Sequence, residues 1–225
     1  MIVARLINPF TFPSFMKPQE LLLDLVNLPA VNLLLNQLRT RCMTEYGHSY
    51  GVFQLGFLMG REAGFDNSEQ YLLGMAGLLH DIGKVEISDI TNKSGDLTDD
   101  EMDVVRTHPK RSYDLIKKWD LPEEVAWMAV AHHEFGRNRY PRDSYNGNGH
   151  DYSGAERRHG SSFTFEGAQV LCACDIFDAL ATQRSYKKPL EIDAAKDRFT
   201  RDFVGNEIIR DALLRIEDLP VLYGK

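Results

Sequence analysis

Residues 72–84 read LLGMAGLLHDIGK, an apolar run that ends in the ionisable pair His80-Asp81. Burial of such a pair at the end of an apolar helix costs free energy unless a charge compensates it. A metal ion supplies that charge, because imidazole and carboxylate are usual ligands of divalent transition metals. A helix C-cap at Gly83 would explain the glycine but not the pair. We therefore predict a buried helix that ends in a metal site.

Further ionisable residues lie in similar surroundings. His132-His133 ends the apolar segment 125–131, and Asp175 lies within another apolar helix. A lone histidine such as His48 is by itself more often a surface or core residue than a ligand. Seven candidate ligands are too many for one ion, and the two oxygens of a carboxylate can bridge two ions. In chain order, the predicted metal ligands are His48, His80, Asp81, His108, His132, His133 and Asp175, which include five of the chain's seven histidines.

Length and composition suit a globular protein. We divide the 225 residues into an N-terminal helical or extended element over residues 1–40 and a larger domain over residues 41–225. The net charge of −7 argues against binding to a nucleic-acid polymer. No apolar run approaches the roughly 20 residues that span a bilayer, and the prolines in residues 1–18 do not fit a signal peptide. We therefore expect a cytoplasmic protein without membrane contact, in which Cys172 and Cys174 are small core residues.

Helical periodicity recurs along most of the chain, and no alternating strand pattern is evident. Thr98 and Glu101 have the spacing of a capping box, and Pro109 and Pro122 are placed to begin helices. We predict an all-α fold whose helices cover about residues 20–39 with a break near Pro29, 44–63, 68–80, 98–106, 108–119, 122–133, 165–182 and 192–216.

One long segment lacks this periodicity. Residues 136–163 are rich in glycine and polar residues, which predicts a loop longer than is common. Its part from about Arg142 to Phe163 either covers or borders the metal site as a mobile lid, or is a passive surface insertion.

Together these residues resemble the signature of the HD superfamily of metal-dependent phosphohydrolases. Its minimal pattern of His, His-Asp and Asp corresponds here to His48, His80-Asp81 and Asp175. The additional histidines at 108, 132 and 133 resemble the HD-GYP branch, a family of cyclic di-GMP phosphodiesterases. Its most specific stretches here are HDIGK (80–84), THP (107–109), HHE (132–134) and DIFDALATQRSY (175–186).

The resemblance implies an HD-domain helical bundle with iron or manganese in its core. One ion would be held by His48, His80, Asp81 and Asp175. A second would be held by Asp81, His108, His132 and His133, so that Asp81 bridges the pair. Lys84 would face the scissile phosphate, with Asp178 orienting it. The implied catalytic residues are Lys84, Asp81 and Asp178, and the implied substrate-binding residues are Arg184, Lys187, Arg139 and Tyr140.

The chain departs from the family pattern in places that concern the substrate more than the metals. Arg139-Tyr140-Pro141 stands where the family has Gly-Tyr-Pro, and the segment from there to the helix of Asp175 is longer than usual. Family members with a third ion carry a glutamate four residues before the first histidine, where this chain has Thr44. Glu45 is expected to face elsewhere.

We predict a metal-dependent phosphodiesterase that hydrolyses cyclic di-GMP at a binuclear centre. One alternative keeps the chemistry and changes the substrate to another cyclic dinucleotide or a nucleotide. Another is a non-catalytic domain that senses a nucleotide or binds a protein. The retained set of metal ligands favours the enzymes, whereas the altered region around Arg139 favours the alternatives. A homodimer is compatible with the sequence.

Overall fold

The computed structural model describes residues 17–138, 162–182 and 188–216. The predicted substrate-binding residues Arg139, Tyr140, Arg184 and Lys187 lie outside these ranges, as does the predicted lid from residue 142 to residue 161. In chain order the elements are α1 (Pro18–Val26), α2 (Pro29–Arg41), α3 (Met43–Glu62), α4 (Asn67–Leu79), the 3-10 helix η2 (Ile82–Ile87), α5 (Ser88–Thr91), α6 (Asp99–Val105), α7 (His108–Lys118), α8 (Glu123–Ala131), α9 (Ser162–Ala181), α10 (Ile192–Asp202) and α11 (Glu207–Arg215).

The predicted all-α fold class is confirmed. In the ranges that the structure describes, the regular elements are helices, and β-pairing is limited to one isolated bridge between Gly136 and Phe203. Among these residues no single helix is long and apolar enough to cross a membrane, although α1 and α2, bent by 92° relative to each other, pass that test as a pair.

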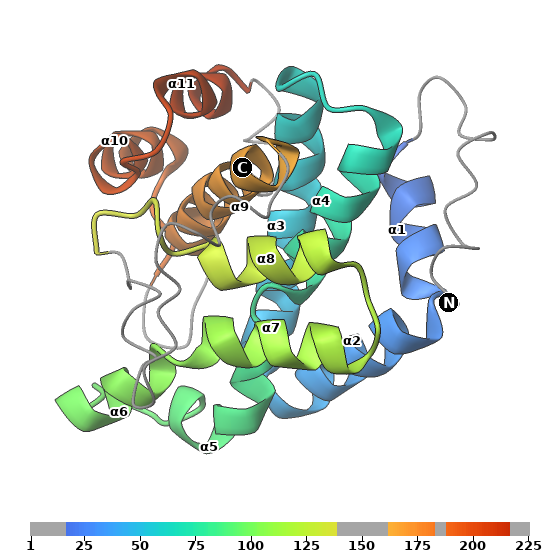
Figure 1. Ribbon diagram of the computed structural model, residues 1–225. Coiled ribbons are helices and arrows are strands. Elements are labelled where there is room, and N and C mark those ends of the chain that lie inside the picture. The colour runs from blue at the N-terminus through green and yellow to red at the C-terminus, as the bar shows by residue number, and fades with distance from the viewer. Residues whose placement is uncertain (1–16, 139–161, 183–187, 217–225) are drawn as a thin grey trace.

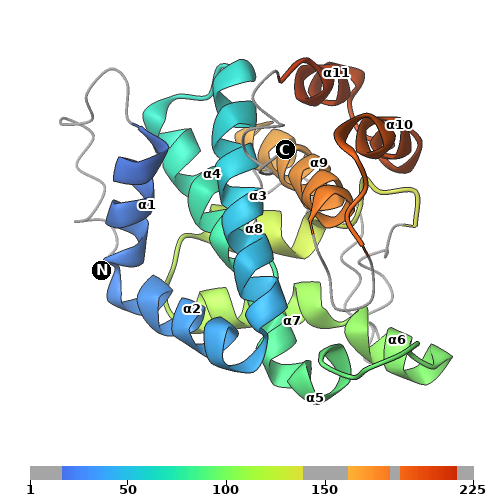
Figure 2. The same ribbon diagram turned by 180° about the vertical axis from the view of Figure 1, so that it is seen from behind.

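Helix α3 runs through the middle of the bundle, packed against both α4 and α9 (Figure 1, Figure 2). Helix α8 contacts α4 and α9, and α7 lies beside α8. Helices α10 and α11 flank α9 on one side, whereas α1 and α2 lie on the opposite side. This arrangement brings the ends of α4, α7 and α8 toward the middle parts of α3 and α9.

Capping residues and prolines lie at the starts of several helices, close to the predicted positions. At α6, Thr98 Oγ1 accepts a hydrogen bond from Glu101 N (3.3 Å), and Glu101 Oε2 accepts one from Thr98 N (2.8 Å), as the capping-box spacing predicts. Asp66 and Glu69 form the same reciprocal pair at α4, with both distances 2.9 Å. Pro29 opens α2 and thereby produces the predicted break.

Two regions differ from the sequence prediction. Residues 82–91, for which no helix was predicted, form η2 and α5. The single helix predicted over residues 192–216 is wrong, because Phe203 leaves the helical conformation (ψ 120°) and Asn206 caps a new helix by accepting a hydrogen bond from Ile208 N (2.8 Å). The apolar periodicity continues across the break because α10 and α11 both pack on α9.

One hydrophobic core joins the N-terminal helices to the rest of the bundle. Leu25 of α1 and Leu38 of α2 belong to the same buried cluster as Phe53 of α3. The domain boundary placed after residue 40 falls next to the break between α2 and α3, and it stays a prediction. Cys172 and Cys174 are free and buried in this cluster, as predicted for small core residues.

Candidate metal centre

The seven predicted metal ligands come from five helices and meet inside the bundle. All are buried except His133, which is partly buried. Buried ionisable side chains are costly without compensating partners, so their convergence calls for a bound charge. The contributing elements are α3 with His48, the end of α4 with His80 and Asp81, the start of α7 with His108, the end of α8 with His132 and His133, and α9 with Asp175.

The first group of ligands surrounds His48. His48 Nε2 lies 2.8 Å from Asp175 Oδ1, and His80 Nε2 lies 3.9 Å from the same oxygen. One ligand atom of each of these three residues lies within 4.8 Å of the others, which is close enough for all three to bind one ion.

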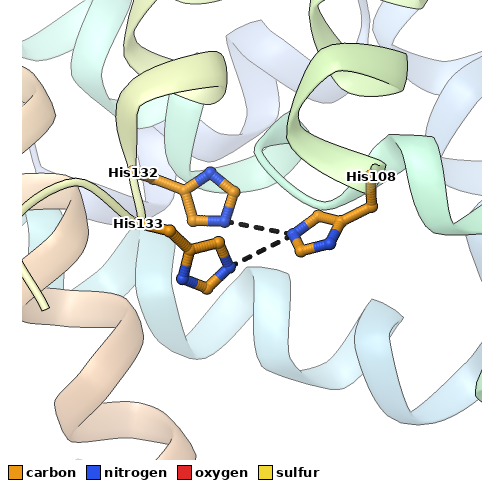
Figure 3. A group of neighbouring side chains, drawn as sticks. All are labelled: His108, His132 and His133. Atoms are coloured by element: carbon orange, nitrogen blue, oxygen red, sulfur yellow. Dashed lines mark hydrogen bonds between the residues drawn. The ribbon is translucent and has the colours of Figure 1, made fainter. Parts of the chain in front are cut away.

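The second group consists of His108, His132 and His133. Figure 3 shows His132 and His133, which follow α8, turned toward His108 at the start of α7. His108 Nε2 lies 3.4 Å from His132 Nε2 and 3.2 Å from His133 Nε2. The adjacent histidines therefore converge on one point, as a shared ion requires.

Asp81 joins the two groups, because each of its carboxylate oxygens faces a different one. Asp81 Oδ1 lies 3.0 Å from His108 Nε2 and 3.8 Å from His132 Nε2. Asp81 Oδ2 lies 3.4 Å from His80 Nε2 and 3.9 Å from His48 Nε2. A carboxylate in this position has the geometry of a bridge between two ions.

Backbone carbonyls hold three of the histidines in one tautomer. The carbonyl oxygen three residues earlier in the chain accepts a hydrogen bond from Nδ1 of His80 (2.9 Å), His108 (2.7 Å) and His132 (2.5 Å). Because a carbonyl oxygen only accepts hydrogen bonds, Nδ1 carries a proton, and Nε2 is the nitrogen whose lone pair a neutral ring offers to the site. In metal sites, the ring nitrogen of histidine that does not bind the metal typically donates a hydrogen bond of this kind, which fixes the orientation of the ring.

The resulting contacts bring acceptors face to face. The Nε2 atoms of His108 and His132 point at each other and at Asp81 Oδ1, so that neutral rings would place acceptors together. His80 Nε2 and Asp81 Oδ1 are buried without a hydrogen-bond partner. Buried acceptors without donors are unfavourable, and cations among them would remove the penalty. Nitrogen and carboxylate donors of this kind fit divalent iron or manganese.

Neighbouring charges keep Asp81 ionised. Burial by itself raises the pKa of Asp81, but opposing interactions, of which the charge of Lys84 is the largest, outweigh burial and hold that pKa well below its usual range. The group is therefore a carboxylate at neutral pH, the form that binds metal ions.

Asp175, His132 and His133 are likewise in their metal-binding forms. Burial raises the pKa of Asp175, but the hydrogen bond and charge of His48 hold it well below its usual range. Burial lowers the pKa of His133 to about 3 and that of His132 well below its usual value. Both imidazoles are neutral at pH 7, so no proton competes for their lone pairs.

Asp178 contacts His48, and its predicted role in orienting Lys84 stays a prediction. Its Oδ2 lies 2.6 Å from His48 Nδ1 and also accepts a hydrogen bond from Thr182 Oγ1 (3.3 Å). A carboxylate behind a histidine ligand fixes the ring and raises its basicity. Gly51, three residues after His48, leaves the space that this carboxylate fills. Helical spacing from His48 was the signal that could have identified Gly51.

Glu45 faces the site, contrary to the prediction that it points elsewhere. Lys84 Nζ lies 2.9 Å from Glu45 Oε2 and 2.7 Å from Asp81 Oδ2. Residues three apart lie on one face of a helix, so Glu45 shares the face of His48, and that spacing could have revealed it.

Gly83 allows η2 to approach α7. A Cβ atom on Gly83 would overlap the backbone carbonyl of His108 and lie 2.6 Å from Ser112 N. Gly83 N also donates a hydrogen bond to Ser112 Oγ (2.9 Å). The alternative of a C-cap glycine is wrong, because Gly83 lies inside η2, and the positive-φ glycines of the described residues are Gly64 and Gly95.

The chain also matches a known domain family and several known sequences. The sequence pattern of the HD domain matches residues 46–180. The chain is 33% identical over 141 residues to a cyclic di-GMP phosphodiesterase response regulator of Xanthomonas campestris, covering 61% of this chain and 34% of that protein. It is 31% identical over 161 residues to a cyclic di-GMP phosphodiesterase of Pseudomonas aeruginosa, covering 70% and 36%.

A further relative matches more of the chain. The 3'3'-cGAMP-specific phosphodiesterase 3 of Vibrio cholerae is 28% identical over 211 residues, covering 86% of this chain and 43% of that protein. The chain thus spans less than half the length of these curated relatives.

The fold agrees with a solved structure. The HD domain of the L. monocytogenes phosphodiesterase PgpH, in complex with cyclic-di-AMP, has a TM-score of 0.57 at 20% identity and covers 86% of this chain and 98% of that one. Because the HD pattern matches more than half of the chain and the predicted HD residues converge in a bundle of that fold, the chain belongs to the HD domain family.

Proposed function

We propose that this chain is a metal-dependent phosphodiesterase that opens a cyclic dinucleotide at a centre of two divalent ions, iron or manganese. The observation that carries the proposal is the position of Asp81, whose two oxygens face two separate groups of histidines. A single ion needs no such bridge, and a purely structural cluster would not point unprotonated nitrogens at one another.

In this proposal each group of residues would supply the ligands of one ion. His48, His80 and Asp175 would hold one ion and His108, His132 and His133 the other, with Asp81 shared between them. Two ions at such a centre lower the pKa of a bound water and neutralise charge on the phosphoryl oxygens. His48 is in turn held by Asp178.

Hydrolysis then needs little further chemistry from the protein. The oxygen of water forms a bond to phosphorus, the bond from phosphorus to the ribose 3' oxygen breaks, and a proton goes to the leaving oxygen. Lys84 places a positive charge 2.7 Å from Asp81 Oδ2, at the edge of the metal centre. A fixed cation there would stabilise negative charge that develops on the phosphoryl oxygens.

The substrate class is proposed from the relatives. Cyclic di-GMP is the first candidate, because the X. campestris and P. aeruginosa proteins are named for it. The second candidate is 3'3'-cGAMP, because the V. cholerae relative named for it aligns with 86% of this chain. Arg139, Tyr140, Arg184 and Lys187 remain the proposed contacts to the nucleotide.

The test is hydrolysis of cyclic di-GMP, 3'3'-cGAMP and cyclic di-AMP by protein loaded anaerobically with Fe(II) or Mn(II). Release of the linear dinucleotide or of mononucleotides from one of them is expected. The control is the His108→Ala variant, which should lose the activity. Tight nucleotide binding without hydrolysis would instead identify a sensing domain, and hydrolysis that persists in protein stripped of metal would contradict the proposal.

A further inference from the structure

Lys84 lies between two carboxylates at the edge of the metal centre. Its Nζ lies 2.9 Å from Glu45 Oε2 and 2.7 Å from Asp81 Oδ2. The side chains of Lys84 and Glu45 are only 15% and 13% exposed, and that of Asp81 is 2% exposed. Attraction between charges is stronger at partly buried positions than in water, so the ammonium is firmly held by both partners.

The carboxylates that hold the ammonium also belong to a further potential ligand set. Ligand atoms of Glu45, His48 and Asp81 lie within 4.8 Å of one another. Because His48 already belongs to the first group, the carboxylates of Glu45 and Asp81 are the ligands of this set that a further divalent ion would use. The ammonium lies within hydrogen-bond distance of the carboxylate oxygens of Glu45 and Asp81. An ion bound to both Glu45 Oε2 and Asp81 Oδ2 would have to occupy the position between these oxygens that the ammonium fills. The ammonium and a third ion therefore exclude each other.

We propose that Glu45 is a positioning residue: it holds the ammonium of Lys84 beside Asp81, where the ammonium takes the place of a third divalent ion. The inference rests on the proposed function, because it assumes that Asp81 is a metal ligand. It adds a reason why this centre takes two ions, and it assigns a task to a residue outside the predicted ligand set.

Glu45 is needed because Asp81 alone cannot fix the lysine. Asp81 Oδ2 also faces His48 and His80, so its charge is shared with the metal centre. A lysine side chain has a flexible four-carbon stem, and a second carboxylate on the neighbouring helix α3 fixes the direction of that stem. A cation fixed before the reaction contributes more to the transition state than one that must be ordered during it.

The first experiment counts ions. Mn(II) bound at saturation is measured by anaerobic equilibrium dialysis for the wild type, Lys84→Ala and the double variant Lys84→Ala/Glu45→Gln. We expect two ions in the wild type, three in Lys84→Ala, where the vacated space lies between the carboxylates of Glu45 and Asp81, and two again in the double variant. Two ions in Lys84→Ala, or three in the wild type, would overturn the inference.

These counts separate the inference from the proposed function. The wild type, Lys84→Ala and the double variant could bind two, three and two ions without hydrolysing any cyclic dinucleotide. That result would support the inference that the ammonium replaces a third ion, and it would refute the proposed substrate class. A wild type that binds fewer than two ions would overturn the binuclear centre and the inference with it. Far-ultraviolet circular dichroism confirms that each variant is folded.

The second experiment tests positioning. For Glu45→Ala, we expect kcat to fall on the order of tenfold to a hundredfold, as a misplaced catalytic group typically costs, with KM changed by less than about twofold and two ions retained. Glu45→Gln keeps an oxygen that can accept a hydrogen bond from Lys84. Its kcat should lie between those of Glu45→Ala and the wild type. The matched control is Glu62→Gln, an exposed glutamate at the end of the same helix, which should be unchanged. Wild-type kcat in Glu45→Ala would overturn the positioning role.

Discussion

The carboxylate of Asp178 lies against Gly51, at the place where any other residue would carry a Cβ atom. Gly51 lies on α3 and Asp178 on α9, so the absence of a side chain sets how closely these two helices approach. The same carboxylate lies 2.6 Å from His48 Nδ1. Gly51 is therefore part of the support of a proposed metal ligand, although it contains no ligand atom.

Gly51→Ala should weaken metal binding. The added methyl group must displace the carboxylate of Asp178, so that this carboxylate no longer contacts His48 Nδ1. Loss of such a supporting carboxylate typically costs roughly 10- to 100-fold in metal affinity. Competition with a fluorescent chelator measures the effect, and an unchanged affinity in the folded variant would show that Asp178 does not orient His48.

The matched control is Gly47→Ala. Gly47 lies on the same helix, one residue from His48, but a Cβ atom there meets nothing within 4 Å. Replacement of a glycine inside a helix by alanine stabilises it by roughly 0.5–1 kcal/mol. Metal affinity should be unchanged and the denaturant midpoint should rise.

Single-ligand variants should separate the two ions. His48→Ala removes a ligand of one proposed ion, and His108→Ala removes a ligand of the other, so each variant should bind one ion. Asp81→Ala should lose both, because Asp81 faces both groups. Elemental analysis of anaerobically purified protein gives the counts. Retention of one ion by Asp81→Ala would contradict the bridge.

Gly83→Ala should lower stability and disturb the ion held by His108. The new Cβ atom would meet the backbone of His108 and Ser112, which cannot rotate away as a side chain can. Overpacking of this kind costs about 1–3 kcal/mol in the free energy of unfolding. Urea unfolding of metal-free protein measures that loss, and a variant as stable as the wild type would contradict the close packing of η2 on α7.

Lys84→Ala should retain the ions held by the two histidine groups and lose turnover. A donor that stabilises developing negative charge is typically worth about 10²–10³-fold in kcat. Steady-state kinetics of protein loaded with two equivalents of Mn(II), so that no third ion replaces the ammonium, tests this, with the bound metal measured in the same sample. Unchanged kinetics in the metal-loaded variant would remove the ammonium from the mechanism.

Much of the fold could be predicted because its signals are local. The capping box at Thr98 and the proline at the start of α2 act on neighbouring backbone groups, so their consequences can be derived from a few adjacent residues. The break between α10 and α11 was missed because both helices bury one face on α9. Apolar periodicity reports that shared burial and does not report the cap at Asn206.

The candidate ligands His80-Asp81 and His132-His133 could be predicted locally, since an ionisable pair at the end of an apolar helix is unusual in any fold, whereas His48 was predicted only from the combined pattern. Their convergence, the two faces of Asp81, the contact of Lys84 with Glu45 and the space left by Gly51 could not. These relations join residues tens of positions apart in sequence, for example Gly51 and Asp178. The types of ligand were thus determined by the sequence itself, because side-chain chemistry is local. The arrangement of the ligand atoms was decided only by the tertiary structure, because the packing of α3 against α4 and α9 sets the distances between them.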